Sequence, residues 1–221
     1  MTEPGTEAAP AAPAGRDTFS RDVLWNVVSL GIAGVLGVAI NSIVGKVYGA
    51  AALGIFNQVF AVYIVVSQLA VLGVHSSTLF HLAARHEIDE QRAIVTAALR
   101  VTALQAIAMG AVFAALALPI ARVLDSPEVA SGIWWATPGL VCFALNKVVL
   151  SALNALRRMR AYAVFQASRI AVMAAALGVL CLVRVDRAAL AMILSIGEGV
   201  TLVAALWTLR DRIGRPAAAV W

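Results

Sequence analysis

Six long apolar stretches constrain the fold of this chain more than any other feature of its sequence. A membrane-spanning helix needs about 20 mostly apolar residues, because the hydrocarbon core of a bilayer is roughly 30 Å thick. The composition agrees, since 62% of the 221 residues are hydrophobic and only 13% are charged. We therefore predict an all-α integral membrane protein, a bundle of six transmembrane helices. The predicted spans are residues 23–44, 53–74, 101–118, 133–156, 161–183 and 188–206.

The two ends of the chain differ in composition from the spans. Residues 1–17 are rich in Ala, Pro, Gly and Glu and contain no apolar run, which predicts a disordered cytoplasmic tail. Its acidic start is unlike the basic start of a signal peptide. We expect the six-helix transmembrane domain over residues 18–210 and a short cytoplasmic C-terminal tail over residues 211–221.

The basic residues predict the orientation in the membrane. Eleven of the 17 Lys and Arg residues fall on the side of the two termini, and four fall on the opposite side. Cytoplasmic loops carry the excess of basic residues, so both termini are expected in the cytoplasm. Because the chain is also rich in Ala and Arg, as suits a bacterium of high GC content, we expect a multi-pass protein of the bacterial cytoplasmic membrane.

Two basic residues fall inside predicted spans. The uncharged run 170–183 is too short to cross a bilayer, so the fifth span extends back to residue 161 and includes Arg169, as a buried or a snorkelling cation. In the fourth span a stripe of polar residues shares one helical face. This stripe consists of Lys147, Ser151, Asn154 and Arg158. A cation as deep as Lys147 costs on the order of 3 kcal/mol, which indicates a functional site or a partner unless the side chain snorkels to the headgroups.

One acidic residue and three amides complete the candidate set. Glu198 is the only acid in any predicted span, and it either forms a structural ion pair with Lys147 or Arg169 or serves as a protonatable coupling site. Asn57 and Gln68 are eleven residues apart and share a helical face, which we expect to point inward. Asn41 lies on a glycine-rich face of the first span. For Asn57 and Gln68, hydrogen bonding between helices and lining of a transport path both remain open. For the face around Asn41, close backbone contact with another helix and lining of a cavity both remain open.

The sequence carries no pattern typical of an enzyme or of a cofactor site. The three histidines do not stack on one helical face, and no carboxylate pattern completes a metal site. No loop is large enough to hold a catalytic centre. The basic residues are spread over short loops, which argues against a nucleic-acid partner. We predict neither an enzyme, nor a cofactor, nor a bound metal.

Three segments resemble a known family. Residues 45–56, which contain Gly-Lys-Val-Tyr-Gly followed by Ala-Leu-Gly-Ile-Phe, are similar to its turn after the first helix. Residues 119–128 resemble its loop before the fourth helix, and residues 154–162 its basic connection before the fifth, without the glycine often found there. The chain thus resembles the N-terminal half of a polysaccharide or lipid-linked oligosaccharide flippase of the multidrug/oligosaccharidyl-lipid/polysaccharide exporter superfamily.

This resemblance implies half of a transporter of twelve to fourteen helices. In that family two bundles enclose a cavity, often basic, and alternate access by rocking against each other. The resemblance implies that Lys147, Arg169 and Arg158 contact the pyrophosphate of a lipid-linked glycan, while Asn41, Asn57 and Gln68 line the path. The chain supplies one bundle. It is therefore expected to form a homodimer, to pair with a separately encoded half, or to be a truncated remnant.

Two other functions remain open. The first is cation-coupled efflux of a small molecule, in which Glu198 is the coupling residue. The second is a non-transporting subunit that organises a polysaccharide-synthesis complex in the bilayer.

Overall fold

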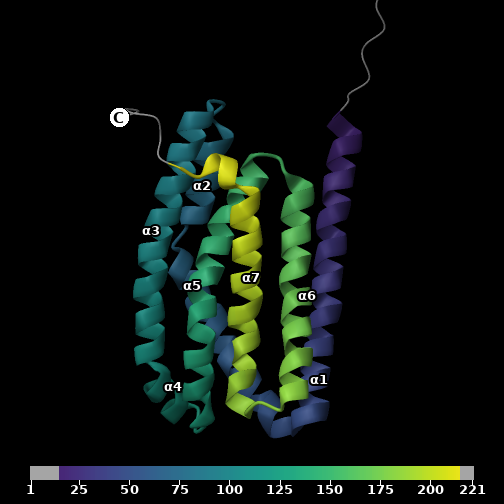
Figure 1. Cartoon of the computed structure of the whole chain (residues 1–221), viewed down its shortest axis with the longest axis vertical. Helices are drawn as coiled ribbons and strands as arrows, with labels where there is room; N and C mark the ends of the chain where they lie inside the picture. Colours follow the sequence, from purple (N-terminus) through teal and green to yellow (C-terminus); the bar gives the residue numbers. More distant parts are fainter. Residues whose placement is uncertain (1–14, 215–221) are drawn as a thin grey trace, which may run out of the picture.

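The computed structural model describes residues 15–214, which form a bundle of helices without any strand in that range (Figure 1). The predicted all-α fold is confirmed. The helices are α1 Gly15–Val71, α2 Val74–Ala83, α3 Ile88–Ala115, α4 Ala117–Val123, α5 Glu128–Ala155, α6 Met159–Val183 and α7 Met192–Thr208, with short 3-10 helices η1 Arg187–Ala191 and η2 Arg210–Arg212.

Most of the two predicted tails lies outside the described residues. The described part begins at Gly15, so the last three residues of the predicted N-terminal tail already belong to α1. At the other end, η2 occupies the start of the predicted C-terminal tail.

Five helical segments of the described chain are long and apolar enough to cross a bilayer. They are Val27–Val71, Ile88–Ala115, Glu128–Ala155, Met159–Val183 and Arg187–Thr208. These spans suggest a multi-pass membrane protein. The sequence predicts six spans, and the difference arises because the first predicted span and all but the last three residues of the second fall within α1.

Helix α1 bends at Gly49. This residue has φ 88° and ψ 173°, a conformation that glycine adopts far more easily than other residues. In Figure 1 the chain runs along the edge of the bundle, reverses near the bend and returns behind α5. We call residues 15–48 the first limb and residues 50–71 the second limb of α1. The reversal lies within the predicted connection between the first two spans.

Helix α3 departs most from the prediction, since it begins at Ile88 rather than near residue 101 and ends at Ala115. Its added turns are polar, and Asp89 and Glu90 stand in the first turn, where carboxylates favour a helix start. Hydropathy detects the part of a helix that crosses lipid, and it misses a polar extension of the same helix.

Helix α5 is the centre of the bundle. It contacts α1, α2, α3, α4, α6 and α7. In the most apolar 18-residue stretch of α5, 61% is buried inside the bundle, whereas the corresponding stretch of α1 is only 17% buried. Small residues allow this close packing: a Cβ atom on Gly132 would lie 2.6 Å from the Val59 side chain. Residues on α5 are therefore the ones placed to meet several helices at once.

Pro138 interrupts the main-chain hydrogen bonding of α5, and a side chain of α7 supplies hydrogen bonds at this point. The helix starts at Glu128 and continues through Pro138. The Ser195 hydroxyl donates to the Trp135 carbonyl at 2.6 Å and accepts from the Gly139 amide at 2.9 Å. Trp135 and Gly139 are four residues apart, so a side chain from α7 bridges the two groups that pair in a regular helix.

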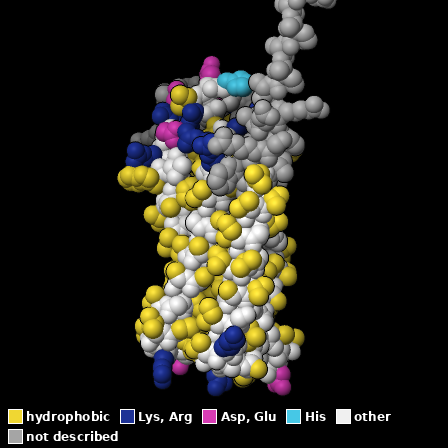
Figure 2. All heavy atoms as spheres, turned by 90° about the vertical axis from the view of Figure 1, so that its right-hand side faces the viewer, with side chains coloured by type: hydrophobic (Ala, Val, Ile, Leu, Met, Phe, Trp, Pro, Cys, Tyr) yellow, Lys and Arg dark blue, Asp and Glu magenta, His cyan; other side chains and the backbone are white. Residues whose placement is uncertain are grey.

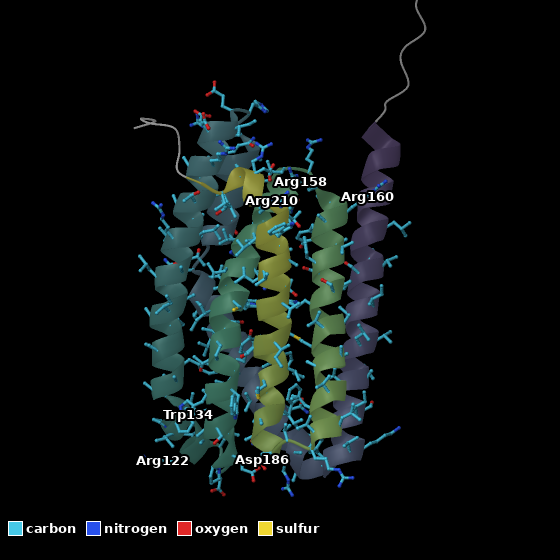
Figure 3. The ribbon with its side chains drawn as sticks, viewed as in Figure 1. Arg122, Trp134, Arg158, Arg160, Asp186 and Arg210 are labelled. Atoms are coloured by element: carbon cyan, nitrogen blue, oxygen red, sulfur yellow. The ribbon has the colours of Figure 1, made fainter. Side chains whose placement is uncertain are left out.

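The surface has an apolar belt between two charged ends. On the face that Figure 2 shows, hydrophobic side chains cover the middle of the bundle, and Lys and Arg lie near both ends. In Figure 3, Arg158, Arg160 and Arg210 lie at one end, which we call the basic end, while Arg122 and Asp186 lie at the opposite end. Helix α1 begins at the basic end, and η2 also lies there (Figure 1).

Candidate functional site

Glu198 on α7 is the centre of a polar cluster inside the bundle. Its side chain is 2% exposed, and its Oε1 lies 3.4 Å from Nη1 of Arg169 on α6. Asn146 on α5 donates from Nδ2 to Oε2 of Glu198 at 2.9 Å and to the Glu198 carbonyl at 2.9 Å. A buried carboxylate without a partner is costly, and here a cation and an amide stabilise it. The structure thus pairs Glu198 with Arg169 rather than with Lys147.

Lys147 and Arg169 both lie over the ring of Phe143. The Lys147 Nζ is 5.4 Å and the Arg169 Cζ 5.8 Å from the ring centroid, distances typical of cation–π contacts. The ring of Tyr63 meets Phe143 edge-on, with centroids 6.2 Å apart. We call Asn146, Lys147, Arg169 and Glu198 the polar cluster. These four side chains carry two cations and one anion.

Several buried atoms of this region keep unused hydrogen-bonding capacity. The Tyr63 hydroxyl, the Asn146 Oδ1 and the Arg169 Nε have no hydrogen-bond partner among the described groups. Lys147 makes no ion pair with an acidic residue whose side chain the structure describes. Because buried polar groups are normally satisfied, these atoms are available to a polar ligand or to water.

Arg158 lies at the far end of the polar stripe, at the basic end. It donates to the Thr208 carbonyl at 3.1 Å and pairs with Asp211 at 3.1 Å, so it caps the end of α7 and holds η2 in place. Burial alone would raise the pKa of the Asp211 carboxyl, but the charge of Arg158 and hydrogen bonds from Arg158 and Arg212 outweigh it and lower the pKa. Ser151 and Asn154 are half-buried between Lys147 and Arg158.

Two of the three predicted path amides do not point into this bundle. Asn57 and Gln68 are exposed, because the second limb packs against α5 through its opposite face, which includes Val59 and Tyr63. Within this bundle the two amides do not face the interior, and their place along a path stays a prediction. Asn41 is half-buried and donates to the Gly37 carbonyl of its own helix at 3.0 Å.

The described side chains form neither a metal site nor a disulfide. Among the side chains that the structure describes, no group of three or more His, Cys, Asp or Glu residues is arranged to hold a metal ion. Cys142 and Cys181 are free thiols.

No protein-family model, curated protein or solved structure matches this chain.

The sequence analysis missed Asn146, Phe143 and Tyr63. Asn146 precedes Lys147 in the fourth predicted span and is 1% exposed, so an uncharged amide in mid-span was the available signal. Phe143 stands one turn before Lys147, at the spacing where neighbouring side chains on a helix meet. Nothing in the sequence distinguishes Tyr63 from other aromatic residues in the spans.

Proposed function

We propose that the protein is a half-size membrane transporter that moves a lipid-linked oligosaccharide or polysaccharide precursor outward across the cytoplasmic membrane. The observation that carries this proposal is the placement of Lys147 and Arg169 over one ring inside the bundle, with Glu198 as the single carboxylate of the cluster. An excess cation at such depth is unfavourable unless it faces a cavity or an anion. The pyrophosphate of a lipid-linked glycan is an anion of the required kind.

The proposal takes α1 as two crossings. The Val27–Val71 segment has 45 residues, which at about 1.5 Å per residue is roughly twice the thickness of the hydrocarbon core. The bend at Gly49 allows each limb to cross once, which makes six crossings. With an even number of crossings, the chain begins and ends on the same side of the membrane. This agrees with the structure, in which the start of α1 and η2 both lie at the basic end (Figure 1). The positive-inside rule assigns the basic end to the cytoplasm.

A single bundle also needs a second half. Transporters of this kind alternate access by moving two bundles about a shared site. The proposed partner is a second copy of this chain or a separate six-helix chain.

The decisive variant is Lys147→Gln. Lys147 forms no ion pair with the described acidic side chains, so the substitution removes a cation without breaking an ion pair among them. We expect the outward transfer of a fluorescent lipid-linked oligosaccharide in proteoliposomes to fall at least about tenfold, as when one charge-assisted contact is lost. Lys46→Gln is the matched control, since Lys46 is exposed in the first limb near the bend. Equal transfer by the Lys147→Gln variant and the native chain would overturn the proposal.

In the cation-coupled efflux alternative, a transported cation must bind to the Glu198 carboxylate in place of the Arg169 guanidinium. Arg169 and Asn146 already occupy its two carboxylate oxygens, so a coupling ion must displace Arg169. Drug accumulation in cells that express Glu198→Gln tests this alternative, which predicts lost efflux alongside normal efflux in Lys147→Gln. The interaction-subunit alternative predicts that both substitutions are tolerated.

A further inference from the structure

An apolar groove of about 310 Å³ lies between α3, α5 and α7. Its apolar lining comes from Leu99 and Ala103 on α3, Leu145 on α5, and Leu202 and Leu206 on α7. Leu99 stands in the first half of α3, Leu206 in the last turn of α7, and Ile213, which also lines the groove, directly after η2, so the groove lies toward the basic end. Its volume is at the lower limit for small-molecule pockets and suits one flexible apolar chain.

Arg100 also lines the groove, and it is exposed. It forms no ion pair with an acidic residue of the described chain. Four other arginines near the same end do pair with carboxylates, namely Arg85, Arg92, Arg158 and Arg212. Arg100 therefore offers a free guanidinium beside an apolar groove, outside the polar cluster.

The surroundings place Arg100 close to the membrane interface. Trp207 follows Leu206, is 69% exposed and carries the guanidinium of Arg210 4.5 Å above its ring. Exposed tryptophans of membrane proteins gather at the headgroup level. One turn before Arg100, the Thr96 hydroxyl donates to the Gly214 carbonyl at 3.1 Å, so the segment after η2 closes the basic end of the groove.

We propose that this groove binds an acyl chain of an anionic bilayer phospholipid whose phosphate pairs with Arg100. The lining matches a hydrocarbon chain, and a guanidinium matches a phosphate through paired hydrogen bonds. Basic pockets between helices on the cytoplasmic side are typical sites for anionic headgroups. The proposal concerns other residues than the transport site and does not depend on it.

The competing occupant is the chain itself. Residues 215–221 follow Gly214 and are mostly apolar, and seven residues reach at most about 25 Å. Their first residue is Arg215, which would bring a second positive charge toward Arg100. Charge complementarity therefore favours a lipid phosphate over this segment.

The experiment is photolabelling of the full chain in nanodiscs made of phosphatidylcholine. The probe is phosphatidylglycerol with a diazirine in one acyl chain, and the matched probe is the phosphatidylcholine analogue. We expect the peptides that contain residues 96–103 and 202–206 to be labelled about fivefold more by phosphatidylglycerol, the contribution of one arginine near an anionic headgroup. Arg100→Gln should reduce this preference to the level of phosphatidylcholine, and Ala103→Trp, which fills the groove, should remove labelling by both probes.

Two variants are controls. Arg122→Gln removes an exposed cation at the opposite end, and Leu182→Trp adds bulk at a side chain that is 85% exposed on α6. Both should label as the native chain does. If Ala103→Trp fails to fold, Arg100→Gln still decides the result.

Three outcomes would overturn the proposal. The first is equal labelling by the two probes in the native chain, or unchanged preference in Arg100→Gln. The second is loss of labelling when inorganic phosphate is added, which would indicate a site for the phosphate group alone. The third is a severalfold rise in labelling after removal of residues 215–221, which would identify the end of the chain as the occupant.

Discussion

Arg169 and Glu198 form an ion pair that joins α6 to α7 inside the bundle, with 3.4 Å between Nη1 and Oε1. Glycine at position 197 lets the two helices come close, since a Cβ there would lie 3.2 Å from the Arg169 carbonyl and would overlap Met173. Asn146 adds α5 to the same contact. Three helices thus meet at one carboxylate.

Arg169→Gln should lower the free energy of unfolding by about 3 kcal/mol, because it leaves a buried carboxylate without its cation. The Arg169→Gln and Glu198→Gln double variant should recover most of this loss, since no buried charge is left unpaired. Unfolding in detergent micelles measures both. Arg160→Gln, an exposed cation on the same helix, is the control and should change the stability by less than about 0.5 kcal/mol. Losses that simply add in the double variant would contradict the coupling.

Gly139→Ala tests the contact between α5 and α7. A Cβ at this position would lie 2.8 Å from the Ser195 amide nitrogen and 2.9 Å from the Leu194 carbonyl carbon, both main-chain atoms. The helices must therefore move apart, at a cost of about 1–3 kcal/mol. Gly178→Ala is the matched control, since a Cβ there meets nothing within 4 Å and should raise stability slightly through helix propensity. Thermal unfolding of the two variants should shift in opposite directions, and a common direction would argue against the close contact.

Ser195→Ala tests the bridge across Pro138. The substitution leaves the Gly139 amide and the Trp135 carbonyl without their hydroxyl partner, which should cost about 1–3 kcal/mol. Ser168→Ala is the control, because the Ser168 hydroxyl bonds only to the Phe165 carbonyl of its own helix. Hydrogen exchange gives a local measurement, with faster exchange expected at the Gly139 amide in the first variant alone. Unchanged protection of that amide would show that the bridge is not needed there.

Much of the fold follows from the lengths of the apolar runs. The predicted spans 133–156 and 161–183 lie close to α5 Glu128–Ala155 and α6 Met159–Val183. The predicted third span begins at residue 101, whereas α3 begins at Ile88, because the first three turns of α3 carry Asp, Glu and Arg side chains that a hydropathy signal does not include. The bend at Gly49 lies where a connection was expected, but the sequence does not show that helix continues to either side of it.

The charged members of the candidate site could be predicted, and the neutral ones could not. Lys147, Arg169 and Glu198 stand out because ionised groups in lipid are costly. Asn146 gave only the weaker signal of an uncharged amide in mid-span, and the part of Phe143 in the cluster becomes visible only when the helices are packed together.

Spacing along a helix has a similar limit. The interval of eleven residues places Asn57 and Gln68 on one face of the second limb. The spacing alone does not decide whether that face points into the bundle or away from it. In the structure it points away, because the opposite, apolar face of the second limb packs against α5.

The pKa of His75, which lies outside the predicted spans, depends on the charge of Lys147. It stands in the first turn of α2, where burial and then the positive charge of Lys147 lower the imidazole pKa from 6.5. Because the folded state holds this proton less tightly than the unfolded state, the contribution of His75 to stability is lost as the pH falls below 6.5. Lys147→Gln should raise the His75 pKa toward its ordinary value without fully restoring it, since burial remains. An NMR titration of ring-labelled histidine in nanodiscs measures the shift, with Lys46→Gln as the control that leaves it unchanged. An equal His75 pKa in all three proteins would argue against a position of Lys147 close to this imidazole.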